Sequence, residues 1–180
     1  VFSAIALFLA LAPPASSTPR QRVVLSRLGR ACSALFGLLA ALTLSQYIFT
    51  WNGGIDEWLF HDAAGAVGTS HPGRMALETA ACFVLLSVAL LFYTASGKSR
   101  GQMLATTVAA VLIETLALLS LSSYALPGSS NFGWLGLTAM AVHTATLFAL
   151  LGASLLAAAW ARYRSAWRLK EKLTFASLSA

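Results

Sequence analysis

Glu114 is the residue whose type and place in the sequence most strongly predict chemistry. It lies near the middle of an apolar stretch at residues 102–124, with no basic residue close to it in the sequence. A carboxylate at the centre of a membrane costs at least ~3 kcal/mol on insertion scales, so such residues usually face a bundle interior and often mark a function. Two interpretations stay open. Glu114 is a functional carboxyl group, or it is a protonated Glu that hydrogen-bonds a hydroxyl or a backbone carbonyl and fixes helix register.

His143 is predicted to lie at the same depth as Glu114. At ~1.5 Å per helical residue, His143 lies ~13 Å below Trp134, and Glu114 lies ~15 Å below Tyr124. On adjacent antiparallel helices these depths match, and we therefore expect a Glu114–His143 pair. Without such a pair, a single intramembrane His is typical of a hydrogen-bonded packing residue.

Metal, haem and catalytic motifs are not predicted. Bis-His haem ligation needs two His at matching depth, and His143 is the one His expected inside a span. A second group of His and acidic residues has suitable ligand types for an outer metal site, but its spacing fits a solvated acidic loop better. Its members are Asp56, Glu57, His61, Asp62 and His71. The sequence contains no nucleophile–base pair, phosphate loop or zinc motif, and so predicts no cofactor, no metal and no enzymatic activity.

The composition is that of a membrane protein. The 180 residues are 58% hydrophobic and 10% charged, against roughly 25% charged in soluble domains. Cys32 and Cys82 lie in apolar segments at different expected depths, which is typical of buried apolar side chains rather than of a disulfide or a metal motif. An all-α membrane protein with little soluble mass follows.

Four apolar segments are long enough to cross a ~30 Å hydrocarbon core. They are residues 31–51, 75–93, 102–124 and 134–163. The sequence therefore predicts a four-helix transmembrane domain at 31–163. It is preceded by an apolar segment and basic linker at 1–30 and followed by a basic tail at 164–180. The first twelve residues are too short to span, and we interpret them as part of an incomplete helix or an interfacial segment rather than as a signal-peptide core.

The basic residues predict the orientation. Of the 12 Lys and Arg residues, 11 fall on one side of the four spans and Arg74 alone on the other. The positive-inside rule then places both termini in the cytoplasm. The tail is expected to touch anionic lipid rather than nucleic acid. The 11 residues are Arg20, Arg22, Arg27, Arg30, Lys98, Arg100, Arg162, Arg164, Arg168, Lys170 and Lys172.

An internal repeat indicates a duplicated helical hairpin. Residues 75–86 and 140–151 share the pattern M-A-x-x-T-A-x-x-F-x-L-L at an offset of 65, and residues 44–47 and 121–124 match at an offset of 77. Repeats of about 31–95 and 101–163 predict a four-helix bundle with a pseudo-twofold axis along the membrane normal.

The offsets of 65 and 77 pair each candidate residue with the residue at the equivalent position of the other repeat. Gly37 corresponds to Glu114, and a glycine facing the carboxyl group would leave room for it. Glu78 corresponds to His143, and these two are also expected to approach across the pseudo-axis. Glu114, His143 and Glu78 are therefore the candidate set of buried polar residues.

Three short stretches carry a resemblance to a known family. Residues 54–60 read G-x-D-x-x-L-F, residues 72–75 read PGRM, and residues 140–145 read M-A-x-H-T-A. Together they resemble the N-terminal membrane region of bacterial signalling proteins in which such a region precedes PAS, histidine-kinase or GGDEF modules. The resemblance covers about residues 31–160 and implies a sensory or anchoring input region of the bacterial inner membrane. Nothing in the 180 residues resembles the output modules themselves.

Three functions remain as hypotheses. The first is a sensor domain that passes a change in hairpin packing through the fourth span into its basic tail. The second is an accessory subunit of a larger respiratory or photosynthetic membrane complex, favoured by small residues at every fourth position of the fourth span, which suit close helix packing. The third is a small proton-conducting protein, disfavoured because its helices lack Gly/Pro breaks. The expected partners are the lipid bilayer and a homo-oligomer or larger membrane complex. The small residues are Ala141, Ala145, Ala149, Ala153 and Ala157.

Overall fold

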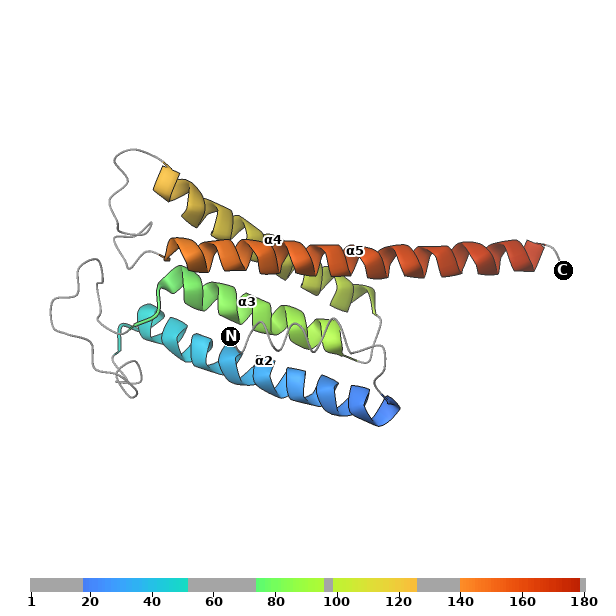
Figure 1. Ribbon diagram of the computed structural model, residues 1–180, viewed down its shortest axis with the longest axis horizontal. Coiled ribbons are helices and arrows are strands. Elements are labelled where there is room, and N and C mark those ends of the chain that lie inside the picture. Colours follow the sequence, from blue (N-terminus) through green and yellow to red (C-terminus); the bar gives the residue numbers. More distant parts are fainter. Residues whose placement is uncertain (1–17, 52–73, 96–98, 126–139, 179–180) are drawn as a thin grey trace.

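The computed structural model describes residues 18–51, 74–95, 99–125 and 140–178, and this part of the chain forms four helices. They are α2 (Pro19–Ile48), α3 (Leu77–Thr94), α4 (Arg100–Ala125) and α5 (Val142–Leu178). The helices run in alternating directions (Figure 1). Each contains a segment long and apolar enough to cross a membrane, at Val23–Ile48, Leu77–Thr94, Arg100–Ala125 and Val142–Ser165. The predicted all-α class and the four apolar helices are confirmed.

Helix α2 begins well before the predicted span. The Thr18 hydroxyl accepts a hydrogen bond from the Gln21 backbone N–H (3.3 Å), and the Gln21 side chain accepts one from the Thr18 N–H (2.7 Å). This capping box satisfies two N–H groups that the first turn leaves free, and Pro19 follows at a position that suits proline. Residues 19–30, predicted to be a linker, are therefore helical and continuous with the first span.

Helix α5 is the longest element and extends past the other three helices (Figure 1). Its 37 residues span ~55 Å at 1.5 Å per residue, well beyond the ~30 Å of a hydrocarbon core. The predicted tail at 164–180 is thus helical up to Leu178. At its other end α5 begins at Val142, eight residues after the predicted start at residue 134.

The helices pack mainly in chain order. Helix α2 packs on α3, α3 on α4 and α4 on α5, with a smaller contact between α3 and α5. A twofold axis relating the hairpins would map the α3/α4 contact onto an equally extensive α5/α2 contact, and the described residues show no contact of that extent. The packing therefore does not confirm the predicted closed four-helix bundle with a pseudo-twofold axis.

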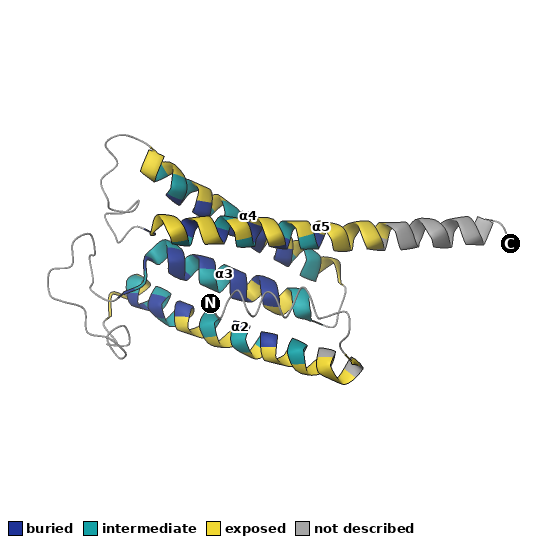
Figure 2. Cartoon of the chain, in the orientation of Figure 1, coloured by how far each residue is buried: buried dark blue, intermediate teal, exposed yellow. Residues whose placement is uncertain are grey.

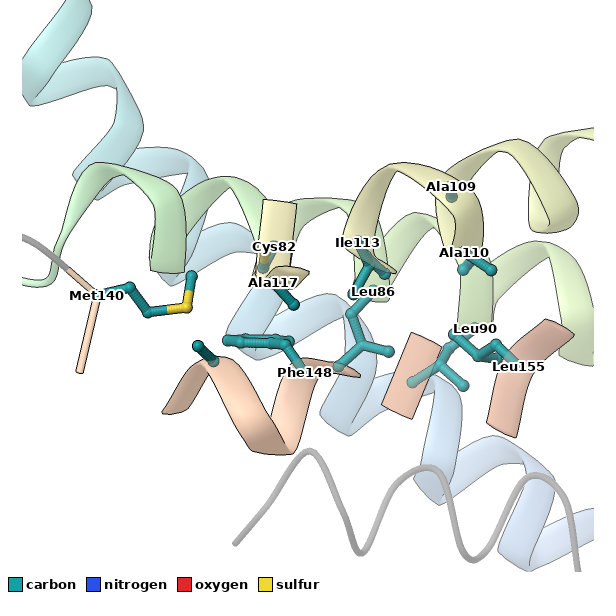
Figure 3. Packing of buried hydrophobic residues seen from close by; sticks show 12 residues of the cluster. Cys82, Leu86, Leu90, Ala109, Ala110, Ile113, Ala117, Met140, Phe148 and Leu155 are labelled. Carbon is teal, nitrogen blue, oxygen red and sulfur yellow. The ribbon is translucent and has the colours of Figure 1, made fainter. Parts of the chain in front are cut away.

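The core lies among α3, α4 and α5 and is built from small and large side chains in equal number (Figure 3). Lipid tails are as apolar as Leu, so helices in a membrane associate through close packing, which small residues permit. Helix α2 lies outside this core, and its half-buried Cys32 and Phe36 pack against it. Exposed residues follow the outward faces of all four helices (Figure 2). The core residues are Cys82, Leu86, Ala89, Leu90, Ala109, Ala110, Ile113, Ala117, Met140, Ala145, Phe148 and Leu155.

Candidate functional site

Glu114 lies at the contact between α4 and α5, opposite Gly152. A Cβ atom added to Gly152 would lie 2.6 Å from the Glu114 carboxyl oxygen Oε2 and 3.3 Å from the Glu114 backbone nitrogen. The missing side chain at Gly152 is therefore what admits the carboxyl group. The expectation that Gly37 makes this room is not met, because Gly37 packs against Ser87 of α3.

The Glu114 carboxyl group has an unmet hydrogen bond. Among the described residues, its Oε2 is the single buried side-chain nitrogen or oxygen atom without a hydrogen-bond partner. The hydroxyls closest in sequence to Glu114 and Gly152 donate to carbonyls of their own helices: Thr115 donates to the Val111 oxygen (2.8 Å) and Ser154 to the Leu150 oxygen (2.7 Å). Leaving a buried polar atom unsatisfied costs about 1–3 kcal/mol. Glu114 is half-buried at the α4/α5 contact, and its carboxyl group is the least satisfied polar site of the described helices.

His143 does not lie near Glu114. Helix α5 begins at Val142, so His143 is in its first turn, where its side chain is exposed. Glu114 is ~16 Å along α4 from Ala125, the end of α4 that lies near the start of α5. The predicted equal depth depended on a span that began at residue 134. The described residues contain no hydrogen bond between His143 and either Glu114 or Glu78.

Glu78 has a different partner from the one expected. It lies in the first turn of α3, and its Oε2 accepts a hydrogen bond from the Ser120 hydroxyl of α4 (2.7 Å). A carboxylate is also favoured there by the free N–H groups at a helix N-terminus. Sequence reasoning missed Ser120 because one serine among many in an apolar helix carries no distinguishing signal. The bond ties the first hairpin, α2/α3, to the second, α4/α5.

The same tyrosine hydrogen bond closes each hairpin. The Tyr47 hydroxyl at the end of α2 donates to the Met75 carbonyl just before α3 (2.9 Å). The Tyr124 hydroxyl at the end of α4 donates to the Met140 carbonyl just before α5 (2.6 Å). Tyr47 and Tyr124 are 77 residues apart, and Met75 and Met140 are 65 apart. These are the two offsets of the sequence repeat.

A second contact recurs midway along each hairpin. In the first hairpin, Gly37 of α2 packs against the Ser87 side chain of α3, and the Ser87 hydroxyl donates to the Ser33 carbonyl (2.7 Å). Glycine is needed at position 37 because a Cβ atom there would overlap the serine side chain. The polar side chain of this contact therefore belongs to α3 and the glycine to α2.

In the second hairpin the roles of the two helices are exchanged. The offsets of 77 and 65 convert Gly37 to Glu114, Ser33 to Ala110 and Ser87 to Gly152. Glu114 and Gly152 are in contact, and a Cβ atom on Gly152 would lie 3.4 Å from the Ala110 carbonyl oxygen. Here the polar side chain belongs to α4 and the glycine to α5. We call these two sites the glycine contacts.

We predict that Tyr47→Phe and Tyr124→Phe destabilise the protein by similar amounts, about 1 kcal/mol each, because each removes the hydrogen bond to a Met carbonyl and keeps the ring. Unfolding of the purified protein in mixed micelles of increasing SDS content measures the change. Tyr163→Phe, on the exposed face of α5, is the control and should be neutral. A loss in one hairpin alone would contradict the equivalence of the two bonds.

Arginine side chains stack on tyrosines at opposite ends of the first hairpin. The Arg162 guanidinium of α5 lies 3.4 Å from the Tyr93 ring centroid, and its Nη1 donates to the Tyr93 carbonyl (2.7 Å). That carbonyl belongs to the last turn of α3, where helix carbonyls lack intrahelical partners and attract cations. At the other end, Arg74 is buried and lies over the Tyr47 ring at 5.3 Å.

The described residues contain no cluster of three or more His, Cys, Asp or Glu side chains that could hold a metal ion. The outer acidic group at residues 56–71 lies outside the described residues. Comparisons with protein-family models, curated proteins and solved structures find no match to this chain. The function is therefore argued from the helix contacts.

Proposed function

We propose that this chain is a membrane sensory or anchoring domain of a bacterial signalling protein, with no catalysis within these residues. In this proposal it lies in the inner membrane with both termini cytoplasmic. The main support is that each hairpin is closed by its own tyrosine bond and its own glycine contact. Two internally closed units can change their packing against one another without losing their own structure, which is what a sensor domain requires.

The proposal includes duplication of an ancestral hairpin. Its support is that both kinds of contact recur at positions related by the same two sequence offsets. The first copy is α2/α3 and the second is α4/α5. Their succession in chain order suits a tandem arrangement, in which the α3/α4 contact has no counterpart.

A change in packing would act at the junction of the two hairpins. At one end Ser120 donates to Glu78, and at the other Arg162 donates to the Tyr93 carbonyl and covers its ring. Arg162 belongs to α5, which continues as a helix to Leu178. Movement of the first hairpin relative to the second would therefore shift the helix that leaves the membrane.

The basic residues support the orientation. The start of α2, the start of α4 and the later part of α5 lie at one end of the structure (Figure 1), which we call the basic end. Arg20, Arg27, Arg100 and Arg164 all lie at this end with exposed side chains. The positive-inside rule assigns such an end to the cytoplasm.

Disulfide cross-linking in native membranes tests the sensor proposal. The reporter is Glu78→Cys with Ser120→Cys, a pair across the hairpin junction. Both native cysteines, Cys32 and Cys82, are first replaced by Ala. We expect the cross-linking yield to change when cells are shifted in pH, osmolarity, redox state or light, because the signal alters packing at this junction.

The matched control is a pair inside one hairpin, Phe36→Cys with Phe83→Cys, whose rings are 6.1 Å apart between centroids. Its yield should stay constant under the same shifts. A constant yield from both pairs would count against a sensor. A parallel change in both would indicate a general effect on oxidation rather than on packing.

The alternative proposal is a non-catalytic accessory subunit of a larger membrane complex. Its support is the small-residue ridge of α5, whose later members Ala153 and Ala157 are exposed rather than packed inside. Small exposed residues allow a partner helix to approach closely. Purification in mild detergent distinguishes the two proposals. An accessory subunit should bring a stoichiometric partner, whereas a sensor should be part of a native polypeptide much heavier than the 18.9 kDa of these residues.

A further inference from the structure

Three aromatic side chains form a stacked, exposed ladder on α5. The Trp160 and Tyr163 rings are 5.9 Å apart and nearly parallel, and the Tyr163 and Trp167 rings are 6.4 Å apart. All three are exposed, and Arg164 is exposed beside them. We call Trp160, Tyr163, Arg164 and Trp167 the aromatic–basic surface.

Arg162 and Arg164 are neighbours in sequence with different surroundings. Residues two apart on a helix are ~200° apart around its axis, at 3.6 residues per turn. Arg162 is turned to α3, where Tyr93 accepts its hydrogen bond and lies under its guanidinium. Arg164 is exposed on another side of α5. Both side chains are exposed, but the Arg162 guanidinium is held over Tyr93, whereas Arg164 lies on the side of α5 that carries the aromatic ladder.

The aromatic–basic surface lies where α5 is expected to leave the hydrocarbon core. From Val142 to Trp160 the helix rises ~27 Å, close to the ~30 Å thickness of the core. Trp and Tyr favour this level of a membrane because each combines an apolar ring with a polar group. Basic side chains at the same level attract anionic lipids.

We propose that the aromatic–basic surface is a binding site for anionic phospholipid headgroups. Arg164 pairs with the headgroup phosphate, and the aromatic ladder lies at the boundary between headgroups and tails. Charge complementarity selects anionic lipid over zwitterionic lipid, and exposure on α5 leaves the surface accessible. This site requires only that α5 cross a membrane and does not depend on the sensor role.

Tryptophan quenching by brominated lipid tests the site. The full chain, with Trp51, Trp58 and Trp134 replaced by Phe, retains Trp160 and Trp167. It is reconstituted into phosphatidylcholine vesicles in which either phosphatidylglycerol or phosphatidylcholine is brominated. We expect brominated phosphatidylglycerol to quench more at equal mole fraction, with a relative affinity of about fivefold, the equivalent of ~1 kcal/mol per basic side chain.

Three arginine variants make the test specific. Arg164→Gln should bring the relative affinity close to one, whereas Arg162→Gln should leave it unchanged, because Arg162 faces Tyr93. Arg164→Lys keeps the charge and should retain the preference, which separates headgroup pairing from a general loss of structure. Equal quenching by the two lipids in the parent protein would overturn the proposal. An equal loss from Arg162→Gln and Arg164→Gln would overturn it as well.

Discussion

Gly152→Ser is expected to destabilise the α4/α5 hairpin by about 1–2 kcal/mol, because the Glu114 side chain can swing aside and the α4 backbone must shift only slightly. A Cβ atom at this position would lie 2.6 Å from the Glu114 carboxyl oxygen and 3.3 Å from the Glu114 backbone nitrogen. Overpacking of an already close contact typically costs 1–3 kcal/mol, because side chains and helices must shift. Unfolding in mixed micelles of increasing SDS content measures the loss.

A second substitution, Glu114→Gly, should recover most of that stability. It removes the carboxyl group that the new serine would meet, and it recreates the Gly37–Ser87 arrangement of the first hairpin. The serine hydroxyl could then donate to the Ala110 carbonyl as Ser87 donates to Ser33. We expect the double variant to be at least 1 kcal/mol more stable than Gly152→Ser alone, a coupling typical of residues in contact. Additive losses would contradict the equivalence of the two glycine contacts.

Phe148→Ala is expected to cost roughly 3 kcal/mol, at the low end of the range for a buried Phe. Phe148 of α5 is 2% exposed, and its ring packs edge-on against Phe83 of α3 at 4.9 Å between centroids. Lipid solvates an apolar side chain as well as the core does, so the loss comes mainly from the unfilled space and not from transfer out of water.

Phe92→Ala provides the matched control for Phe148→Ala. Phe92 lies on α3 and is 41% exposed, so its truncation should change stability by less than 1 kcal/mol. The same SDS titration measures both variants. A loss at Phe148 no larger than at Phe92 would contradict the packing of α3 against α5 around this ring.

Hydropathy predicted the four apolar helices because a span must be long and apolar whatever it packs against. Helix ends were harder to predict, because they depend on local caps rather than on apolar content. Arg20 and Arg27 suggested a solvated linker, yet the T-P-R-Q sequence beginning at Thr18 is a capping box followed directly by α2. That signal was present in the sequence and overrides the charge pattern.

The candidate site was predicted in part. The cost of a carboxylate in an apolar helix directed attention to Glu114, which lies half-buried at the α4/α5 contact. Its partner was missed because depth was counted from the predicted ends of the spans. When a predicted end is wrong, every residue counted from it is placed at the wrong depth and on the wrong side of the helix. A shift of eight residues at the start of α5 moves His143 to the first turn and onto the exposed side. The offsets of 77 and 65 convert the Gly37–Ser87 pair to Glu114–Gly152. The second contact could therefore be inferred from the sequence only if the first were already known.

The exchanged glycine contacts also favour the correct helix pairs during assembly. Helices related by the two offsets resemble one another, and a chain inserting into a bilayer could form a glycine contact between α2 and α5, or between α4 and α3 in place of their native contact. In the same register, the first mispairing would set Gly37 against Gly152 and leave a gap, and the second would press Glu114 onto Ser87. Each correct pair instead combines one glycine with one polar side chain. The two glycine contacts therefore disfavour an exchange of helices between the hairpins, both within one molecule and between neighbouring copies.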